Sequence, residues 1–230
     1  MPKNSAISDN LILIKNKINE YEQKYHREPG SVQLLAASKT QSIEKITAAY
    51  RAGQYCFGEN RLQEALDKIS QLHALNIEWH FIGSIQRNKT KKIAGHFSWV
   101  HSVDNVLILD RLNTQRPTHL PPLNICLEVN LSDEASKSGV HLDDVLQLAA
   151  YCKNLSNLRL RGLMSVPAPC IDFAEQRAQF KLLSDCYQLL RQQGFSLDTL
   201  SMGMSDDFEA AIAEGSTMVR IGTSIFGKRE

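Results

Sequence analysis

One lysine, Lys39, has a setting that favours chemistry. It follows the short apolar run 33–37, whose length and polar boundaries predict a buried strand. A lysine at the end of such a strand lies at the mouth of the core and is partly desolvated. Desolvation favours the neutral amine, which is the form that attacks a carbonyl carbon. The alternative is a solvated loop lysine, which is the common case for lysines taken one at a time.

Small and hydroxylated residues late in the chain offer a partner for that lysine. Ser201, Gly203 and Ser205 follow one apolar segment, and Gly222 and Thr223 follow the next. Small residues let backbone N–H groups approach a phosphate, and hydroxyl groups add further donors. A phosphate site facing the lysine suits a phosphorylated aldehyde held as an imine. The first group could equally be only a turn before a capped helix.

Four further residues lie at or near predicted strand ends and are candidates for lining the pocket: Asn60, His80, Met164 and Arg220. Three of them have a purely structural alternative. Asn60 could be a helix cap, His80 a core histidine between two aromatic residues, and Arg220 half of an ion pair. The histidines show neither HExxH nor a pair at i, i+4, and the five cysteines form no CxxC. We therefore expect no metal site and no disulfide framework.

The elements that must position these residues are eight short apolar segments that alternate with amphipathic ones. Eight strand–helix units are the count of a (β/α)8 TIM barrel, in which functional groups gather at the carboxyl ends of the strands. A doubly wound open sheet is the alternative architecture. It would normally carry a Gly-rich dinucleotide turn after its first strand, where this chain has Ser-Lys-Thr. The predicted strands are 33–37, 55–57, 79–82, 99–101, 124–129, 158–164, 200–202 and 218–221, with an extra amphipathic helix at 9–25 before them.

Length and composition agree with a single domain over residues 1–230. The chain is 43% hydrophobic, which is enough for the core of one α/β barrel. Its net charge of +1 argues against a dedicated nucleic-acid binder, so the basic run 87–92 is interpreted as a solvated helix face, with phosphate binding as the alternative. No stretch approaches the roughly 20 apolar residues of a membrane span, and the first ten residues lack a signal-peptide core. We expect a cytoplasmic protein with reduced thiols.

Seven motifs occur in order along the chain. They are Leu-Ala-Ala-Ser-Lys-Thr at 35–40, Phe-Gly-Glu-Asn at 57–60, Trp-His-Phe-Ile-Gly at 79–83 with Gln-x-Asn-Lys at 86–89, Ser-Lys-Ser-Gly at 136–139, Arg-Gly-Leu-Met at 161–164, Leu-Ser-Met-Gly-Met-Ser-Asp-Asp at 200–207 and Val-Arg-Ile-Gly-Thr at 219–223. Together they resemble the YggS/PROSC family of pyridoxal phosphate homeostasis proteins. The resemblance spans residues 31–228, and seven motifs in register make it specific.

This resemblance implies a barrel like the barrel half of alanine racemases, with pyridoxal 5′-phosphate (PLP) held as a Schiff base on Lys39. Members of the family are similar in being cytoplasmic, mostly monomeric and without an established turnover. They look like carriers or regulators of the PLP supply, and PLP-dependent apo-enzymes are the expected recipients. By the same resemblance, Asn60, His80 and Met164 line the pocket, Ser201, Gly222 and Thr223 hold the phosphate beside the turn Gly203–Ser205, and Arg220 faces the pyridine nitrogen or the phosphate.

The alternative function is a PLP-dependent enzyme such as an amino-acid racemase. Racemisation needs an acid/base group on each face of the substrate α-carbon, and the lysine could serve one face. Alanine racemases take a tyrosine for the other face from an additional β domain and a partner subunit. The chain ends before such a domain, and its tyrosines fall in or beside helices and the second strand. We therefore expect a non-catalytic PLP-binding protein with no nucleic-acid or membrane partner.

Overall fold

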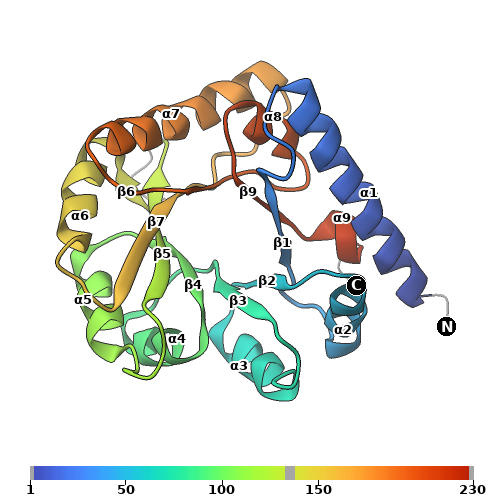
Figure 1. Ribbon diagram of the computed structural model, residues 1–230, viewed down its shortest axis with the longest axis horizontal. Coiled ribbons are helices and arrows are strands. Elements are labelled where there is room, and N and C mark those ends of the chain that lie inside the picture. The colour runs from blue at the N-terminus through green and yellow to red at the C-terminus, as the bar shows by residue number, and fades with distance from the viewer. Residues whose placement is uncertain (1–2, 133–137, 228–230) are drawn as a thin grey trace.

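The computed structural model describes residues 3–132 and 138–227, so part of the 136–139 motif lies outside the described residues. Eight parallel strands form a closed ring, because each pairs with the next along the chain and the last pairs with the first. The eight-stranded barrel predicted from the sequence is confirmed, and the open sheet is excluded (Figure 1). The ring strands are β1 (Gln33–Ala37), β2 (Cys56–Glu59), β3 (Glu78–Phe81), β4 (Trp99–Val103), β5 (Leu123–Asn130), β7 (Leu158–Met164), β8 (Thr199–Ser201) and β9 (Met218–Ile221).

Helices follow every ring strand and cover the outside of the barrel (Figure 1). Side-chain caps start several of them, as Ser42 does for α2 by accepting from the Lys45 N–H at 3.4 Å and Asn105 does for α5 by accepting from the Ile108 N–H at 3.0 Å. The helical elements are α1 (Lys3–Lys24), α2 (Ile43–Arg51), α3 (Leu62–Gln71), the 3₁₀ turn η1 (Arg87–Lys89), α4 (Thr90–His96), α5 (Val106–Gln115), the 3₁₀ turn η2 (Leu142–Asp144), α6 (Val145–Cys152), α7 (Phe173–Gln192), α8 (Phe208–Ala213) and α9 (Thr223–Phe226).

Some predicted boundaries were wrong. The first helix begins at Lys3 rather than at residue 9, and α8 begins at Phe208 because 205–207 form a turn instead of its first helical residues. Two short elements were not predicted. The two-residue strand β6 (Val140–His141) pairs with the end of β5, and α9 follows the last ring strand. None of the described helices is both long enough and apolar enough to span a bilayer.

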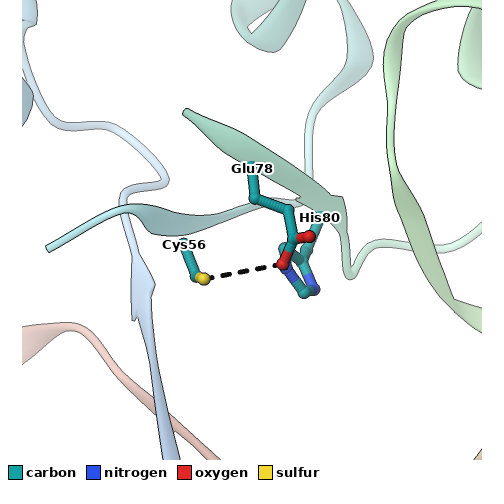
Figure 2. A group of neighbouring side chains, drawn as sticks. All are labelled: Cys56, Glu78 and His80. Carbon is teal, nitrogen blue, oxygen red and sulfur yellow. Dashed lines mark hydrogen bonds and ion pairs between the residues drawn. The ribbon is translucent and has the colours of Figure 1, made fainter. Parts of the chain in front are cut away.

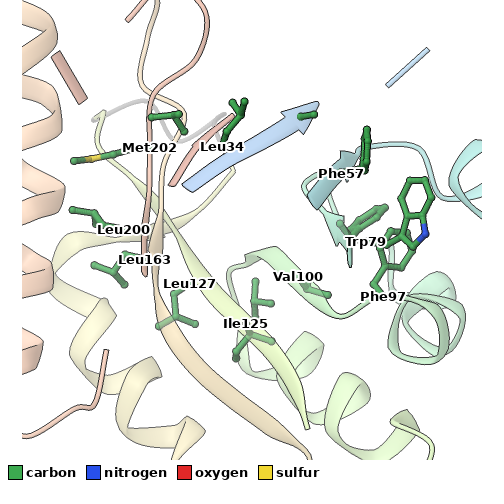
Figure 3. Packing of buried hydrophobic residues seen from close by; sticks show 14 of the residues in the cluster. Leu34, Phe57, Trp79, Phe97, Val100, Ile125, Leu127, Leu163, Leu200 and Met202 are labelled. Atoms are coloured by element: carbon green, nitrogen blue, oxygen red, sulfur yellow. The ribbon is translucent and has the colours of Figure 1, made fainter. Parts of the chain in front are cut away.

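The main core lies between the strands and the surrounding helices. Outward-facing strand residues such as Phe57, Trp79 and Leu127 pack there in one continuous apolar cluster (Figure 3). The inside of the barrel differs. Its apolar content includes a small separate cluster of Trp99, Cys126 and Met164, and polar side chains fill much of the remaining space. The barrel interior is therefore where buried polar chemistry is concentrated.

Candidate functional site

Lys39 is half-buried in a turn that directly follows β1. The Ser38 N–H donates to the Gly58 carbonyl at 2.9 Å, which extends the pairing of β1 with β2 by one residue. Thr40 has φ +64°, a left-handed conformation that costs a β-branched residue on the order of 1–3 kcal/mol. The strain lies next to the lysine, and the surrounding contacts have to hold the turn against it.

A buried ion pair beneath this turn supplies those contacts. The Lys68 ammonium on α3 donates to the Glu59 carboxylate and to the Ser38 carbonyl, both at 2.8 Å. It also bonds Glu64, whose carboxylate accepts from the Thr40 N–H at 2.6 Å. Burial raises the pKa of Glu59, and the Lys68 charge opposes that rise. One cation therefore fixes the backbone on both sides of Lys39.

The end of β9 lies directly against the end of β1. A Cβ atom added to Gly222 would approach the Ala37 carbonyl oxygen to 3.0 Å, so the two backbones are in contact two residues before Lys39. Within the described part of the chain, the N–H groups of Thr223 and Ser224 at the start of α9 have no hydrogen-bond partner. The lysine and an edge of N–H groups without a described partner therefore share one seam of the barrel.

The turn after β8 completes that edge. Gly203 has φ +97°, and a Cβ atom there would lie 2.6 Å from Cβ of Ala211, so both conformation and space require glycine. Its carbonyl accepts from the Arg220 N–H at 2.9 Å, which ties the turn to β9. The N–H groups of Gly203 and Ser205 bond no described residue. Together with those of Thr223 and Ser224, they form the set of free donors that a phosphate needs.

Arg220 and Ser201 lie deeper, inside the barrel, and contact each other. One guanidinium nitrogen donates to the Ser201 hydroxyl at 2.8 Å and to its carbonyl at 2.6 Å, and the other donates to the Ser165 carbonyl at 2.9 Å. Burial lowers the pKa of Arg220 to about 10, against the opposing charges of Asp207 and Glu128. The Ser201 hydroxyl is therefore already engaged, and its expected role as a phosphate donor stays a prediction.

From Ser201 a chain of hydrogen bonds crosses the barrel interior. The hydroxyl lies 3.0 Å from Nδ1 of His101, Nε2 of His101 lies 2.9 Å from Nδ1 of His80, and Nε2 of His80 lies 2.9 Å from Glu78. Burial lowers the pKa of both histidines, and the hydrogen bond from His80 lowers the pKa of Glu78. An ionised carboxylate can only accept, so His80 donates to Glu78 from Nε2. If both rings are neutral, Nδ1 of His80 then accepts from Nε2 of His101, and Nδ1 of His101 accepts from the Ser201 hydroxyl, which itself accepts from Arg220. His80 thus reaches the serine only through His101.

Asn60 follows β2 and presents an unpaired polar atom. Its side-chain oxygen Oδ1 is buried and has no hydrogen-bond partner among the described residues. The backbone of Asn60 is fixed by Gly83 after β3, since a Cβ atom on that glycine would overlap the Asn60 carbonyl. A buried acceptor without a donor costs roughly 1–3 kcal/mol, so Asn60 is suited to receive a hydrogen bond from a ligand.

The structure thus brings Lys39, Asn60, Gly203, Gly222 and Thr223 to the carboxyl end of the barrel, with Ser205 beside them. Met164 is 2% exposed and packs inside with Trp99 and Cys126. His80, Ser201 and Arg220 form part of the polar interior below. In this arrangement the Lys39 amine and backbone N–H groups without a described partner lie at one end of the barrel, and the Arg220 cation lies below them. That donor set fits an anionic carbonyl compound.

Sequence reasoning missed the residues that support this site. His101 lies in β4 beside β3, and placing inward-facing positions of neighbouring strands next to each other could have paired it with His80. Lys68 and Glu64 are spaced i, i+4, which indicates a helix pair but not its contact with Ser38. That contact depends on how α3 packs against β1, and no local pattern reports it.

Comparison with known proteins agrees with this picture. Residues 10–230 match the family model described as alanine racemase, N-terminal domain. A protein of Pseudomonas aeruginosa named pyridoxal phosphate homeostasis protein is 53% identical over 98% of this chain and 97% of its own length. An Escherichia coli K12 protein of the same name is 47% identical, with 97% of each chain covered.

Solved structures show the same fold. The structure of PipY from Synechococcus elongatus PCC7942 with PLP bound is 36% identical and superposes with a TM-score of 0.85, over 96% of this chain and 100% of that one. The alanine racemase of Corynebacterium glutamicum is 16% identical and has a TM-score of 0.71 over 98% of this chain and 61% of its own. The racemase therefore shares the barrel, and PipY shares sequence as well as fold.

Proposed function

Because this chain belongs to the alanine racemase N-terminal domain family, together with relatives named pyridoxal phosphate homeostasis protein, we propose that it binds PLP and serves PLP homeostasis. The single observation that carries the proposal is the seam between β1 and β9. There Gly222, which precedes α9, lies against Ala37, and Lys39 follows Ala37 by two residues. When bound, PLP supplies an aldehyde carbon, a phosphate dianion and a pyridine nitrogen.

Each part of the site has a role in this proposal. The amine of Lys39 bonds the aldehyde carbon covalently, and the Lys68 ammonium holds the backbone on which Lys39 stands. The free N–H groups receive the phosphate, and Arg220 supplies a fixed positive charge on the inner side. The residues proposed to hold PLP are Lys39, Asn60, His80, Met164, Ser201, Gly203, Ser205, Arg220, Gly222 and Thr223.

The proposed role is storage and delivery rather than turnover. Racemisation needs a second acid/base group opposite the lysine. The six tyrosines lie on α1, α2, α6 and α7, just after α1 or just before β2. The hydroxyls of Tyr25, Tyr151 and Tyr187 donate to Glu209, Asp110 and the Leu197 carbonyl. None of these hydroxyl contacts is with a residue proposed to hold PLP. We propose a cytoplasmic monomer that passes PLP to apo-enzymes.

Borohydride reduction of the PLP-loaded protein, followed by peptide mapping, tests the site. We expect the pyridoxyl group on Lys39, and no covalent attachment in Lys39→Ala. Lys92→Ala, which removes an exposed amine of α4, is the control and should load normally. Covalent PLP retained by Lys39→Ala would overturn the assignment.

The carrier role needs a second experiment. PLP-loaded protein is mixed with a PLP-dependent apo-aminotransferase, and recovery of activity is compared with the rate at which PLP leaves into buffer containing a scavenger. Recovery faster than release into solvent supports direct delivery. Turnover of amino acids by the purified protein that disappears in Lys39→Ala supports the racemase alternative instead.

A further inference from the structure

Three potential metal ligands meet toward the amino end of the barrel, at the opposite end from Lys39, and one of them, His80, is also among the residues proposed to hold PLP. Cys56 begins β2 and pairs directly with Glu78 of β3, and His80 lies two residues further along β3 on the same face (Figure 2). Their Sγ, Oε1 and Nε2 atoms all lie within 4.8 Å of one another. The sulfur is 3.5 Å and the imidazole nitrogen 2.9 Å from the same carboxylate oxygen.

We propose that Cys56, Glu78 and His80 bind a divalent zinc ion. Thiolate, imidazole and carboxylate are the three side-chain ligand types that zinc takes, and zinc is tetrahedral with bonds of about 2.0–2.3 Å. Tetrahedral ligands at those bond lengths lie roughly 3–4 Å apart. The separations of 3.5 Å and 2.9 Å from the shared carboxylate oxygen are close to this spacing, and all three ligand atoms lie within 4.8 Å of one another, so side-chain rotations can bring them around one ion. Magnesium and calcium prefer oxygen ligands in larger number, and a thiolate disfavours them.

The surroundings provide access and a fourth position. His80 is fully buried, while the side chain of Glu78 is 42% exposed and Cys56 is half-buried. A hollow of about 460 Å³ opens onto the two outer ligands, which gives a cation an entry path and gives water room to complete the tetrahedron. The hollow is lined by Tyr50, Tyr55, Cys56, Asn76, Ile77, Glu78 and Ser98.

The interior supplies the outer support that such sites need. A histidine that binds metal through one ring nitrogen usually donates from the other. Nδ1 of His80 faces Nε2 of His101 at 2.9 Å, and Nδ1 of His101 faces the Ser201 hydroxyl at 3.0 Å. When zinc binds Nε2 of His80, the proton of that ring moves to Nδ1 and is donated to Nε2 of His101. The proton of His101 then lies on its Nδ1 and is donated to the Ser201 hydroxyl. Both rings change tautomer, and each keeps one proton.

The binding step releases a proton from the thiol. The thiol of Cys56 donates to the Glu78 carboxylate at 3.5 Å, so it carries its proton before a metal ion binds. A sulfur–zinc bond forms as the S–H bond breaks, and the proton passes to solvent. We expect about one proton released per zinc ion bound at pH 7.

The test is a zinc titration of metal-free, PLP-loaded protein in competition with a chromophoric chelator. We expect one site with a Kd below about 1 μM, a value consistent with three charged or imidazole ligands. Cys56→Ser and Glu78→Gln should each weaken it at least about tenfold without unfolding the barrel, because both residues are only half-buried. Cobalt(II) in the same site should give a thiolate charge-transfer band that Cys56→Ser abolishes.

A matched control exists elsewhere in the chain. Cys170 lies 2.8 Å from the Glu175 carboxylate, which makes a thiol–carboxylate pair at an exposed position. Cys170→Ser should leave zinc affinity and proton release unchanged. The proposal fails if zinc binds no tighter than about 100 μM, if Cys56→Ser binds as tightly as the unaltered chain, or if Cys170→Ser removes the same site. Each of these outcomes is independent of whether PLP is bound on Lys39.

Discussion

The ammonium of Lys68 donates a hydrogen bond to the backbone oxygen of Ser38, 2.8 Å away, and so sets the position of the residue that follows it. Most lysines serve solubility, but this one is 5% exposed and paired with a fully buried Glu59. Buried ion pairs add little net stability, yet removing one partner leaves a charge without compensation. Removing Lys68 alone should therefore cost more stability than the intact pair contributes.

Replacing Lys68 with methionine keeps an unbranched side chain one atom shorter and removes the charge. We expect the free energy of unfolding to fall by about 3–5 kcal/mol, because Glu59 loses its cation. PLP affinity should fall as well, since the turn at Lys39 loses its anchor. Urea denaturation and absorbance titration with PLP measure the two effects. Lys181→Met breaks an exposed i, i+4 pair with Asp185 and should change neither quantity; equal losses in both variants would contradict this reading.

Gly203→Ala tests the turn after β8. The new methyl group would lie within 2.6 Å of Ala211 and sit on a backbone with φ +97°, so we expect a marked loss of stability and of PLP binding. Gly194 has a similar φ of +81° but nothing within 4 Å of an added Cβ. Gly194→Ala should cost only the conformational penalty, about 1 kcal/mol. Thermal denaturation compares the two, and equal shifts would show that the contact with Ala211 is unimportant.

Glu128 gives stability a dependence on pH. Burial, with a smaller contribution from Asp104, raises its pKa from 4.5 to about 7. Between those values the folded chain holds a proton that the unfolded chain has lost, so this group makes stability fall as pH rises through that window. Glu128→Gln should remove the fall and stabilise the PLP-free protein at pH 8 by up to about 3 kcal/mol. Denaturation at pH 5 and pH 8 measures it, with the exposed Glu20→Gln as control; a slope unchanged by Glu128→Gln refutes the assignment.

Asn60→Ala separates ligand binding from stability. The Oδ1 atom has no described partner, so its loss should leave the PLP-free protein as stable as before or slightly more stable. PLP affinity should nevertheless fall. Asn105→Ala removes the cap of α5 and should show the opposite pattern, a cost of about 1 kcal/mol with unchanged PLP affinity. Unaltered PLP binding in Asn60→Ala would remove Asn60 from the pocket.

The fold could be predicted from the sequence because each strand–helix unit is marked by its own apolar run and the turn residues that follow it. The apolar run before Lys39 and the turn residues after each strand are read from neighbours alone, and eight such units allow few arrangements. The resemblance to a family added the cofactor and the order of the site residues. Boundaries were less accurate where local preference and packing compete, as at Ser205, whose turn delays α8 to Phe208.

The interior contacts could not be found from spacing within a single segment. His80 and His101 come from two strands, and their hydrogen bond depends on stagger between neighbours around the ring. Cys56 and Glu78 likewise become partners only through the register of β2 with β3. A spacing rule compares positions within one segment of the sequence, so it cannot detect a cluster whose residues come from different strands.

The contact between Gly222 and Ala37 has a consequence for how long the folded barrel resists degradation. The two strands it joins are first and last in the ring, so their pairing closes the barrel across the longest intervening stretch of chain. PLP bound to Lys39 after β1 and to the N–H groups at the start of α9 would add bonds across this seam. Loaded molecules should therefore resist proteases far better than empty ones, and a cell short of vitamin B6 should hold less of this protein.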